Sequence, residues 1–231
     1  MKVLPQDTRL DDTILIAGFH GIGATGYWTI KFLITELKAS RKCFIDYEHS
    51  PAVASQSEGR IATPYEVYTA GDLSLLKAEV SPVRERENEF YRELAEWIMS
   101  NSIREVALVG GLDEALRTDE HRYRLAMTSS FLSRGNPQGE PVLEEDRVIV
   151  GPVASLLNIF EMNQFPAYAV LAYSSTDRVD PRAAAAAVDF LSRRYGFSAD
   201  TAPLIKGAEA IEGELKSMEE KEKSPSASVY S

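Results

Sequence analysis

The chain has 231 residues, 44% of them hydrophobic, and a formal net charge of -10. This length is enough to bury one large core without disulfides, and Cys43, the single cysteine, allows none within the chain. The acidic balance argues against nucleic acid or an anionic membrane as a partner, because both would repel such a surface.

The N-terminal part of the sequence predicts a β-α-β unit. Residues 13–18 form a short apolar run closed by a glycine, which indicates a strand, and residues 24–40 place large apolar side chains at helical spacing. Residues 42–46 indicate a second strand. Because crossovers of this kind join parallel strands, we expect the centre of the sheet to be parallel.

A hairpin and a second β-α-β unit are expected next. Residues 66–70 and 74–80 read as paired strands, residues 83–100 as an amphipathic helix, and residues 105–109 as a buried strand that ends at Gly110 and Gly111. Further along, we expect strands at 123–128, 147–150 and 167–173, a loop at 135–146, and helices at 152–161, 181–195 (stopped by Gly196) and from 201 to about 220.

Alternating strands and helices make the fold class α/β, built as a single domain. The domain is expected to span residues 1–222, and residues 223–231 are expected to be a flexible tail. The Ser-Pro-Ser-Ala-Ser stretch at 224–228 cannot support regular structure.

A glycine motif follows the first predicted strand. Gly21, Gly23 and Gly26 form a G-x-G-x-x-G pattern, and Asp46 lies about twenty residues further on, as in dinucleotide-binding folds. In those folds the first glycine comes directly off the strand, whereas residues 18–20 intervene here. We therefore favour the interpretation that the glycines permit a tight loop and close packing of the helix on the sheet. A nucleotide- or dinucleotide-binding enzyme remains the alternative.

Other catalytic patterns are missing from the sequence. It contains neither a G-x-S-x-G nucleophile motif nor a P-loop, and its three histidines lack the spacing of zinc sites. We therefore expect no enzyme activity, no cofactor and no metal site. Residues 1–12 carry no secretory signature, and no apolar run approaches the roughly 18 to 20 residues of a membrane span, so we expect a cytoplasmic protein.

The last three residues, Val229, Tyr230 and Ser231, have no core to join. Together they offer an apolar side chain, an aromatic ring with a hydroxyl, and a carboxylate that a lysine in a partner's groove could bind. We expect them to dock on another protein, so that the chain works by binding rather than by catalysis.

The sequence resembles the archaeal branch of the proteasome-assembling chaperone family over residues 13 to about 215. The likeness rests on short motifs that are distributed along the chain. These are Gly18-Phe19 with Gly23 and Gly26, Phe32-Leu33-Ile34, Ile45-Asp46, Val109-Gly110-Gly111, Gly151-Pro152 with Leu156-Leu157, Phe165-Pro166-Ala167 with Val170-Leu171, Asp180-Pro181, and Ala183-Ala184.

The resemblance implies a three-layer α/β sandwich like that of nucleoside phosphorylases but without their active site. It has a mainly parallel central sheet, and a C-terminal helix and flexible tail follow it here. The resemblance also implies a homo-oligomer that assists assembly of the proteasome core particle. Some family members end in a hydrophobic-Tyr-any (HbYX) motif, which maps onto Val229, Tyr230 and Ser231. By analogy, this tripeptide would insert between neighbouring α subunits of the core particle.

Overall fold

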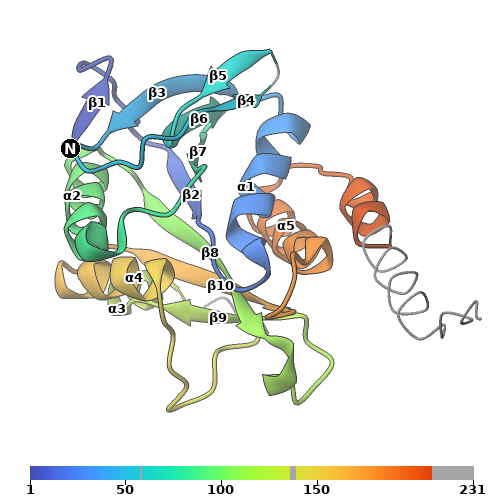
Figure 1. The fold of residues 1–231 in the computed structure, drawn as a ribbon. Coiled ribbons are helices and arrows are strands. Elements are labelled where there is room, and N and C mark those ends of the chain that lie inside the picture. The colour runs from blue at the N-terminus through green and yellow to red at the C-terminus, as the bar shows by residue number, and fades with distance from the viewer. Residues whose placement is uncertain (58, 136–138, 210–231) are drawn as a thin grey trace, which may run out of the picture.

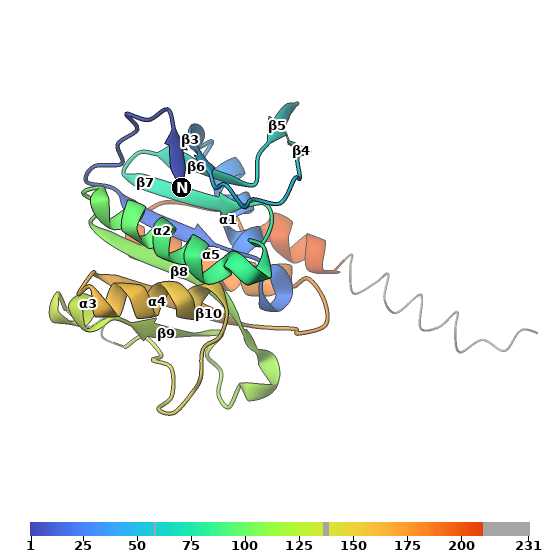
Figure 2. The same cartoon turned by 60° about the vertical axis from the view of Figure 1, so that its left-hand side comes forward.

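The computed structural model describes residues 1–57, 59–135 and 139–209. It is built around an eight-stranded sheet with helices on both faces (Figures 1 and 2). In the described part of the chain, no helix is long and apolar enough to cross a membrane. The sheet runs in the order β1 (Lys2–Leu4), β3 (Ser40–Asp46), β6 (Tyr65–Ala70), β7 (Leu73–Ala78), β2 (Ile14–Gly18), β8 (Glu105–Asp113), β10 (Ala167–Ser174) and β9 (Tyr123–Met127).

The centre of the sheet is parallel. β2 pairs in parallel with β7 on one side and with β8 on the other, and β8 pairs in parallel with β10. The outer strands pair antiparallel. All residues of β2 and β10 are buried, as expected for strands whose two faces are both covered by helices. This confirms the expected α/β class with a mainly parallel central sheet.

The helices form two outer layers. α1 (Thr25–Glu36) and α5 (Pro181–Tyr195) cover one face, and α2 (Glu87–Ser100) and α4 (Pro152–Met162) cover the other. Successive side chains of a strand point to opposite faces, so that Ile16 joins the core under α1 and α5, whereas Leu15 joins the core under α2 and α4. The smaller elements are α3 (Ser129–Ser133), the 3-10 helices η1 (Ile22–Ala24), η2 (Arg84–Arg86) and η3 (Glu114–Leu116), and a separate hairpin of β4 (Ser55–Ser57) and β5 (Arg60–Ala62).

The ends of α5 follow from its sequence. The side chain of Asp180 accepts hydrogen bonds from the backbone amides of Arg182 and Ala183, which would otherwise lack partners in the first turn. Gly196 ends the helix in the left-handed conformation, with φ 71°. Both ends agree with the helix predicted for residues 181–195.

The predicted β-α-β unit is present, because β2 and β3 run parallel in one sheet and α1 joins them in the chain, although β6 and β7 lie between them in the sheet. The structure corrects two of the sequence predictions. β8 does not stop before Gly110 but continues to Asp113, since the backbone pairing with β10 needs no side chain. Residues 147–150 form no strand, and Val148 and Val150 are 80% and 73% exposed.

The sequence analysis also missed β1 and the β4–β5 hairpin. These short strands lack the apolar runs that mark the central strands. At the C-terminal end, residues 202–209 are helical, in agreement with the start of the last predicted helix. The remainder of that helix and the tail predicted for residues 223–231 lie outside the described residues.

Candidate functional site

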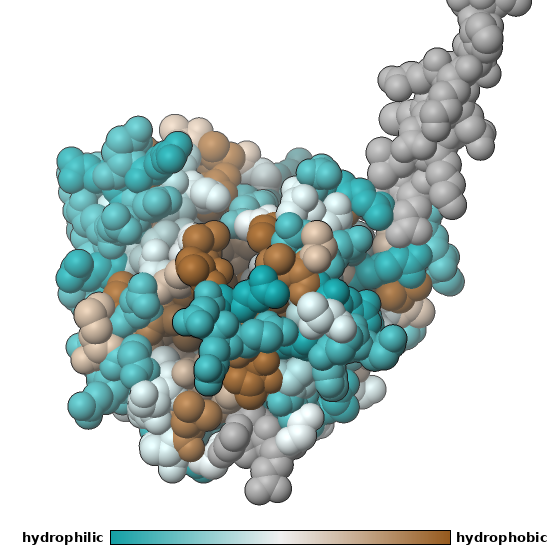
Figure 3. Space-filling view, turned by 90° about the horizontal axis from the view of Figure 1, so that it is seen from below, coloured by the Kyte–Doolittle hydropathy of each residue, from teal (hydrophilic) through white to brown (hydrophobic). Residues whose placement is uncertain are grey.

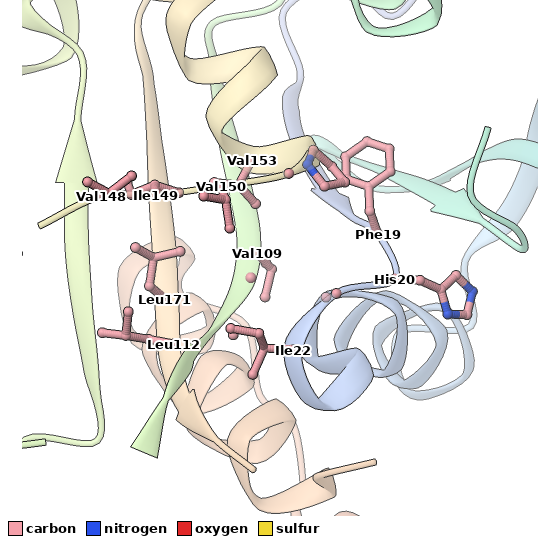
Figure 4. Close-up of a pocket in the computed structure, with 16 residues that line it drawn as sticks. Phe19, His20, Ile22, Val109, Leu112, Val148, Ile149, Val150, Val153 and Leu171 are labelled. Carbon is pink, nitrogen blue, oxygen red and sulfur yellow. The ribbon is translucent and has the colours of Figure 1, made fainter. Parts of the chain in front are cut away.

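A pocket of about 200 Å³ lies where β2 and β8 end at the carboxyl edge of the sheet (Figure 4). The chain leaves β2 through α1 and continues to β3 on one side, whereas it leaves β8 towards β9 and β10 on the other side. Such a reversal of direction between neighbouring strands is the usual place for a ligand in open α/β sheets. The position of this pocket in the sheet therefore makes it the first candidate for a ligand-binding site.

The lining of this pocket is mainly apolar. Its walls come from the loop after β2, the end of β8, residues 148–151 and the start of α4. Figure 3 shows hydrophobic side chains gathered around a hollow on the face of the molecule that contains this edge. No lysine or arginine is among the described residues that line it. The labelled side chains in Figure 4 that line the pocket are Phe19, His20, Ile22, Val109, Leu112, Val148, Ile149, Val150, Val153 and Leu171.

His20 lies at the edge of this pocket. Its ring stacks on Tyr27 at 4.4 Å between centroids, and its Nε2 atom lies 3.0 Å from the carbonyl oxygen of Glu79. Apart from this imidazole, whose Nε2 already lies against the carbonyl oxygen of Glu79, the described lining offers no cationic side chain to a phosphate chain. The chemistry of the pocket suits a small apolar group better than a dinucleotide.

The glycine motif lies beside the pocket, and its geometry supports the packing interpretation. A Cβ atom at Gly26 would lie 2.4 Å from the carbonyl oxygen of Val109, and one at Gly23 would lie 1.8 Å from Oγ of Ser174. These two glycines let the start of α1 lie directly against β8 and β10. By contrast, a Cβ atom at Gly21 would meet nothing within 4 Å.

Asp46 does not reach the glycine motif. It ends β3 and is exposed, and β6 and β7 lie between β3 and β2. Three strand spacings separate β3 from β2 by about 14 Å, whereas the acidic residue of a dinucleotide fold ends the strand beside the glycine loop. The structure thus brings Gly21, Gly23 and Gly26 together but leaves Asp46 apart.

A second cluster was missed by the sequence analysis. Glu66 on β6 and Lys77 on β7 face each other in the sheet, with 3.2 Å between Oε2 and Nζ, and Lys77 also lies 3.2 Å from Oε2 of Glu79. Arg41 contacts Oε1 of Glu66 at 2.9 Å. The two-residue turn between β6 and β7 fixes this register, whereas the predicted strands at 66–70 and 74–80 left three residues between them and so did not place Glu66 opposite Lys77.

Hydrogen bonds and the ion pairs with Lys77 keep buried Glu66 and partly buried Glu79 charged. Burial alone would raise the pKa of Glu66, but the Thr63 amide, the Tyr68 hydroxyl and Lys77 outweigh it and hold this pKa below its usual value. Burial likewise opposes the net effect at Glu79, where Lys77, Ser55 and Tyr27 lower the pKa. Among the described residues, no group of three or more His, Cys, Asp or Glu side chains could hold a metal ion.

The predicted docking residues Val229, Tyr230 and Ser231 lie outside the described residues. The helix at 202–209 is the last described part of the chain before them. Their role therefore remains a prediction from sequence.

Comparisons with known proteins show what this chain is similar to. The chain is similar to the crystal structure of Pyrococcus furiosus PbaA, an archaeal homolog of proteasome-assembly chaperone, at 24% identity and a TM-score of 0.79; the match covers 93% of this chain and 90% of PbaA. It is also similar to P. furiosus PbaB, an archaeal proteasome activator, at 21% identity and a TM-score of 0.74, over 90% of this chain and 94% of PbaB. Both similarities show that this chain shares its fold with PbaA and PbaB.

The family assignment comes from the sequence. No curated protein sequence matches the chain. The model of the PAC2 family, however, matches residues 15–219, which is most of the described domain and part of the segment after it. The chain belongs to the PAC2 family.

Proposed function

We propose that this chain is a non-catalytic proteasome assembly chaperone or activator, which acts in the cytoplasm and binds the α subunits of the proteasome core particle. The observation that carries the proposal is the PAC2 match over residues 15–219, in a chain whose fold is that of PbaA and PbaB. PbaA is described as a homolog of a proteasome-assembly chaperone and PbaB as a proteasome activator. The family assignment and these two relatives both support the proteasome as the partner of this chain.

The docking element in this proposal is the tripeptide Val229, Tyr230 and Ser231. Val229 and Tyr230 supply apolar and aromatic surface for a groove between neighbouring subunits, and the carboxylate of Ser231 would pair with a lysine there. The net charge of -10 makes a basic pocket a suitable partner for this carboxylate.

One tail alone would bind weakly, because ordering a flexible segment costs about 1 to 2 kcal/mol per residue in backbone entropy. We infer that the chain is a homo-oligomer whose tails engage one ring together. Such multivalency can raise the apparent affinity by about 10² to 10⁴ without any new contact. The body of the protein would then set the spacing of the tails.

Binding of a purified α ring to the immobilised chain tests this proposal by surface plasmon resonance. We expect Tyr230→Ala to abolish measurable binding, and the neighbouring Ser228→Ala, which leaves the tripeptide intact, to bind like the wild type. Light scattering on the same samples checks that both variants keep the oligomeric mass of the wild type. Equal binding by wild type and Tyr230→Ala would reject the tail as the docking element.

A further inference from the structure

A second cavity, of about 490 Å³, lies on the side of the molecule that carries α1 and the β4–β5 hairpin (Figure 1). Its walls come from α1, from the strands β3, β6 and β7, and from the hairpin. Hydrogen bonds between described residues join the hairpin to the rest of the domain, among them one from Ser55 Oγ to Glu79 Oε1 at 3.0 Å and one from Arg41 to the carbonyl oxygen of Ile61 at 3.1 Å. It lines one side of the cavity as a separate two-stranded sheet.

Positive charge gathers in this cavity, although the chain as a whole carries a charge of -10. Lys31, Arg41, Arg60 and Lys77 all line it, and Glu79 is the one carboxylate among its described lining residues. Lys77 is almost completely buried, with 5% of its side chain exposed. A cluster of cations around a hollow concentrates anions there, because the low-dielectric walls focus the field.

Folding stability alone does not explain why the ion pair of Glu66 and Lys77 is buried. Replacing a buried ion pair by apolar side chains of similar volume is often neutral or stabilising. Glu66, behind the cavity wall, already receives hydrogen bonds from Arg41, Tyr68 and the Thr63 amide, besides its ion pair with Lys77. Its charge is therefore satisfied by neighbouring groups.

Arg41 and Lys31 have N–H groups that could donate hydrogen bonds to a ligand. The side-chain hydrogen bonds of Arg41 to described residues all use Nη1, whereas a guanidinium carries five N–H groups. Lys31 lies 5.5 Å and 5.0 Å from the ring centroids of Tyr27 and Trp28 and forms no ion pair with a described residue. The hydroxyls of Thr35 and Ser57 belong to the same lining.

We propose that this cavity binds a small molecule through an oxyanion, which is a phosphate or a carboxylate group. Lys31 and Arg41 are the groups that contact the anion, whereas Lys77 stays paired with Glu66 and Glu79 in the wall. The volume is in the range of ligand pockets, so the cavity can also hold the body of a small metabolite. This inference does not depend on binding to the proteasome.

Isothermal titration of the full-length protein with inorganic phosphate and with citrate tests the proposal, at constant ionic strength. We expect at least one of the two anions to bind. Phosphate alone would identify a phosphorylated ligand, and citrate alone a carboxylate ligand. The absence of binding by either anion at millimolar concentration would overturn the proposal.

Two matched variants locate the site. Lys31→Gln removes an exposed cation of the cavity and should weaken binding about tenfold, as expected for a lost charged hydrogen bond. Lys206→Gln removes an exposed lysine that does not line the cavity and should leave binding unchanged. Equal affinity of wild type and Lys31→Gln would place the anion elsewhere and reject the site.

Hydrogen exchange gives an independent measurement. Because the hairpin lines the cavity, the bound anion should slow amide exchange in residues 55–57 and 60–62, and about tenfold more anion should be needed for the same slowing in Lys31→Gln. Unchanged exchange in the hairpin at saturating anion would contradict binding beside it.

Discussion

Glu66 and Lys77 face each other on β6 and β7 with both side chains buried and 3.2 Å between Oε2 and Nζ. Lys77→Met removes one of the two cations that contact buried Glu66 and leaves Arg41 as the other, so it should lower the free energy of unfolding by about 2 to 3 kcal/mol, as for a lost hydrogen bond to a charged group. Glu66→Gln combined with Lys77→Met should lose less than the sum of the two single changes. Urea unfolding of the three variants measures both effects, and exact additivity would show that the pair does not interact.

Substitutions at Gly26 and Gly21 distinguish the two interpretations of the glycine motif, which are close packing of the helix and dinucleotide binding. In Gly26→Ala the new methyl group would lie 2.4 Å from the backbone oxygen of Val109, which cannot move aside cheaply, so we expect a loss of about 3 kcal/mol. Gly21 has extended backbone, with φ -169°, and open space around it, so Gly21→Ala should change stability by less than about 0.5 kcal/mol. Thermal unfolding compares the two; similar losses at both positions would contradict packing as the reason for the motif.

Cys43 is buried in β3, and burial raises the pKa of its thiol to about 11. The thiolate is the nucleophile, so the folded protein should react with iodoacetamide at pH 8 far more slowly than the protein unfolded in urea. Mass spectrometry of the labelled chain follows this difference over time. Equal labelling rates in the two states would show that the strand opens readily or that the thiol is exposed.

Tyr27 and Tyr123 should make the fold sensitive to alkali. Burial, followed by the effect of Glu79, raises the pKa of Tyr27 to about 12, and burial with Glu140 raises the pKa of Tyr123 to about 12. A pKa that is higher in the folded state contributes stability that is complete below the ordinary value of 10.0 and is lost as pH rises towards 12. Circular dichroism and absorbance at alkaline pH should show unfolding and tyrosine ionisation together. Ionisation of these tyrosines near pH 10 in the folded protein would contradict the prediction.

The central strands and α5 could be predicted from sequence because their signals are local. β2 and β10 are continuous apolar runs, and α5 has Pro181 in its first turn and Gly196 directly after it. The position of β3 could not be predicted, because strand order depends on which apolar faces meet after collapse and not on adjacent residues. The β-α-β pattern predicted only that β3 runs parallel to β2, and the structure places β6 and β7 between these two strands.

At the two candidate sites, one feature could not be predicted from the sequence and another could be predicted once the turn was known. Gly110 and Gly111 looked like the end of a strand, but they continue β8, where Gly111 leaves room for the backbone of Ile22. Glycine permits both a turn and a close approach, and only the packed structure tells them apart. Glu66 and Lys77, by contrast, were predictable partners once the hairpin turn was known, because the turn fixes which residues lie opposite each other.

The central claim is that the last three residues bind the α ring of the proteasome core particle. The most direct measurement is surface plasmon resonance of purified core particle on the full-length chain and on a chain that lacks Val229, Tyr230 and Ser231. We expect binding by the full-length chain and its loss in the truncated one, with the same oligomeric mass for both. Undiminished binding by the truncated chain, or no binding by either, would contradict it.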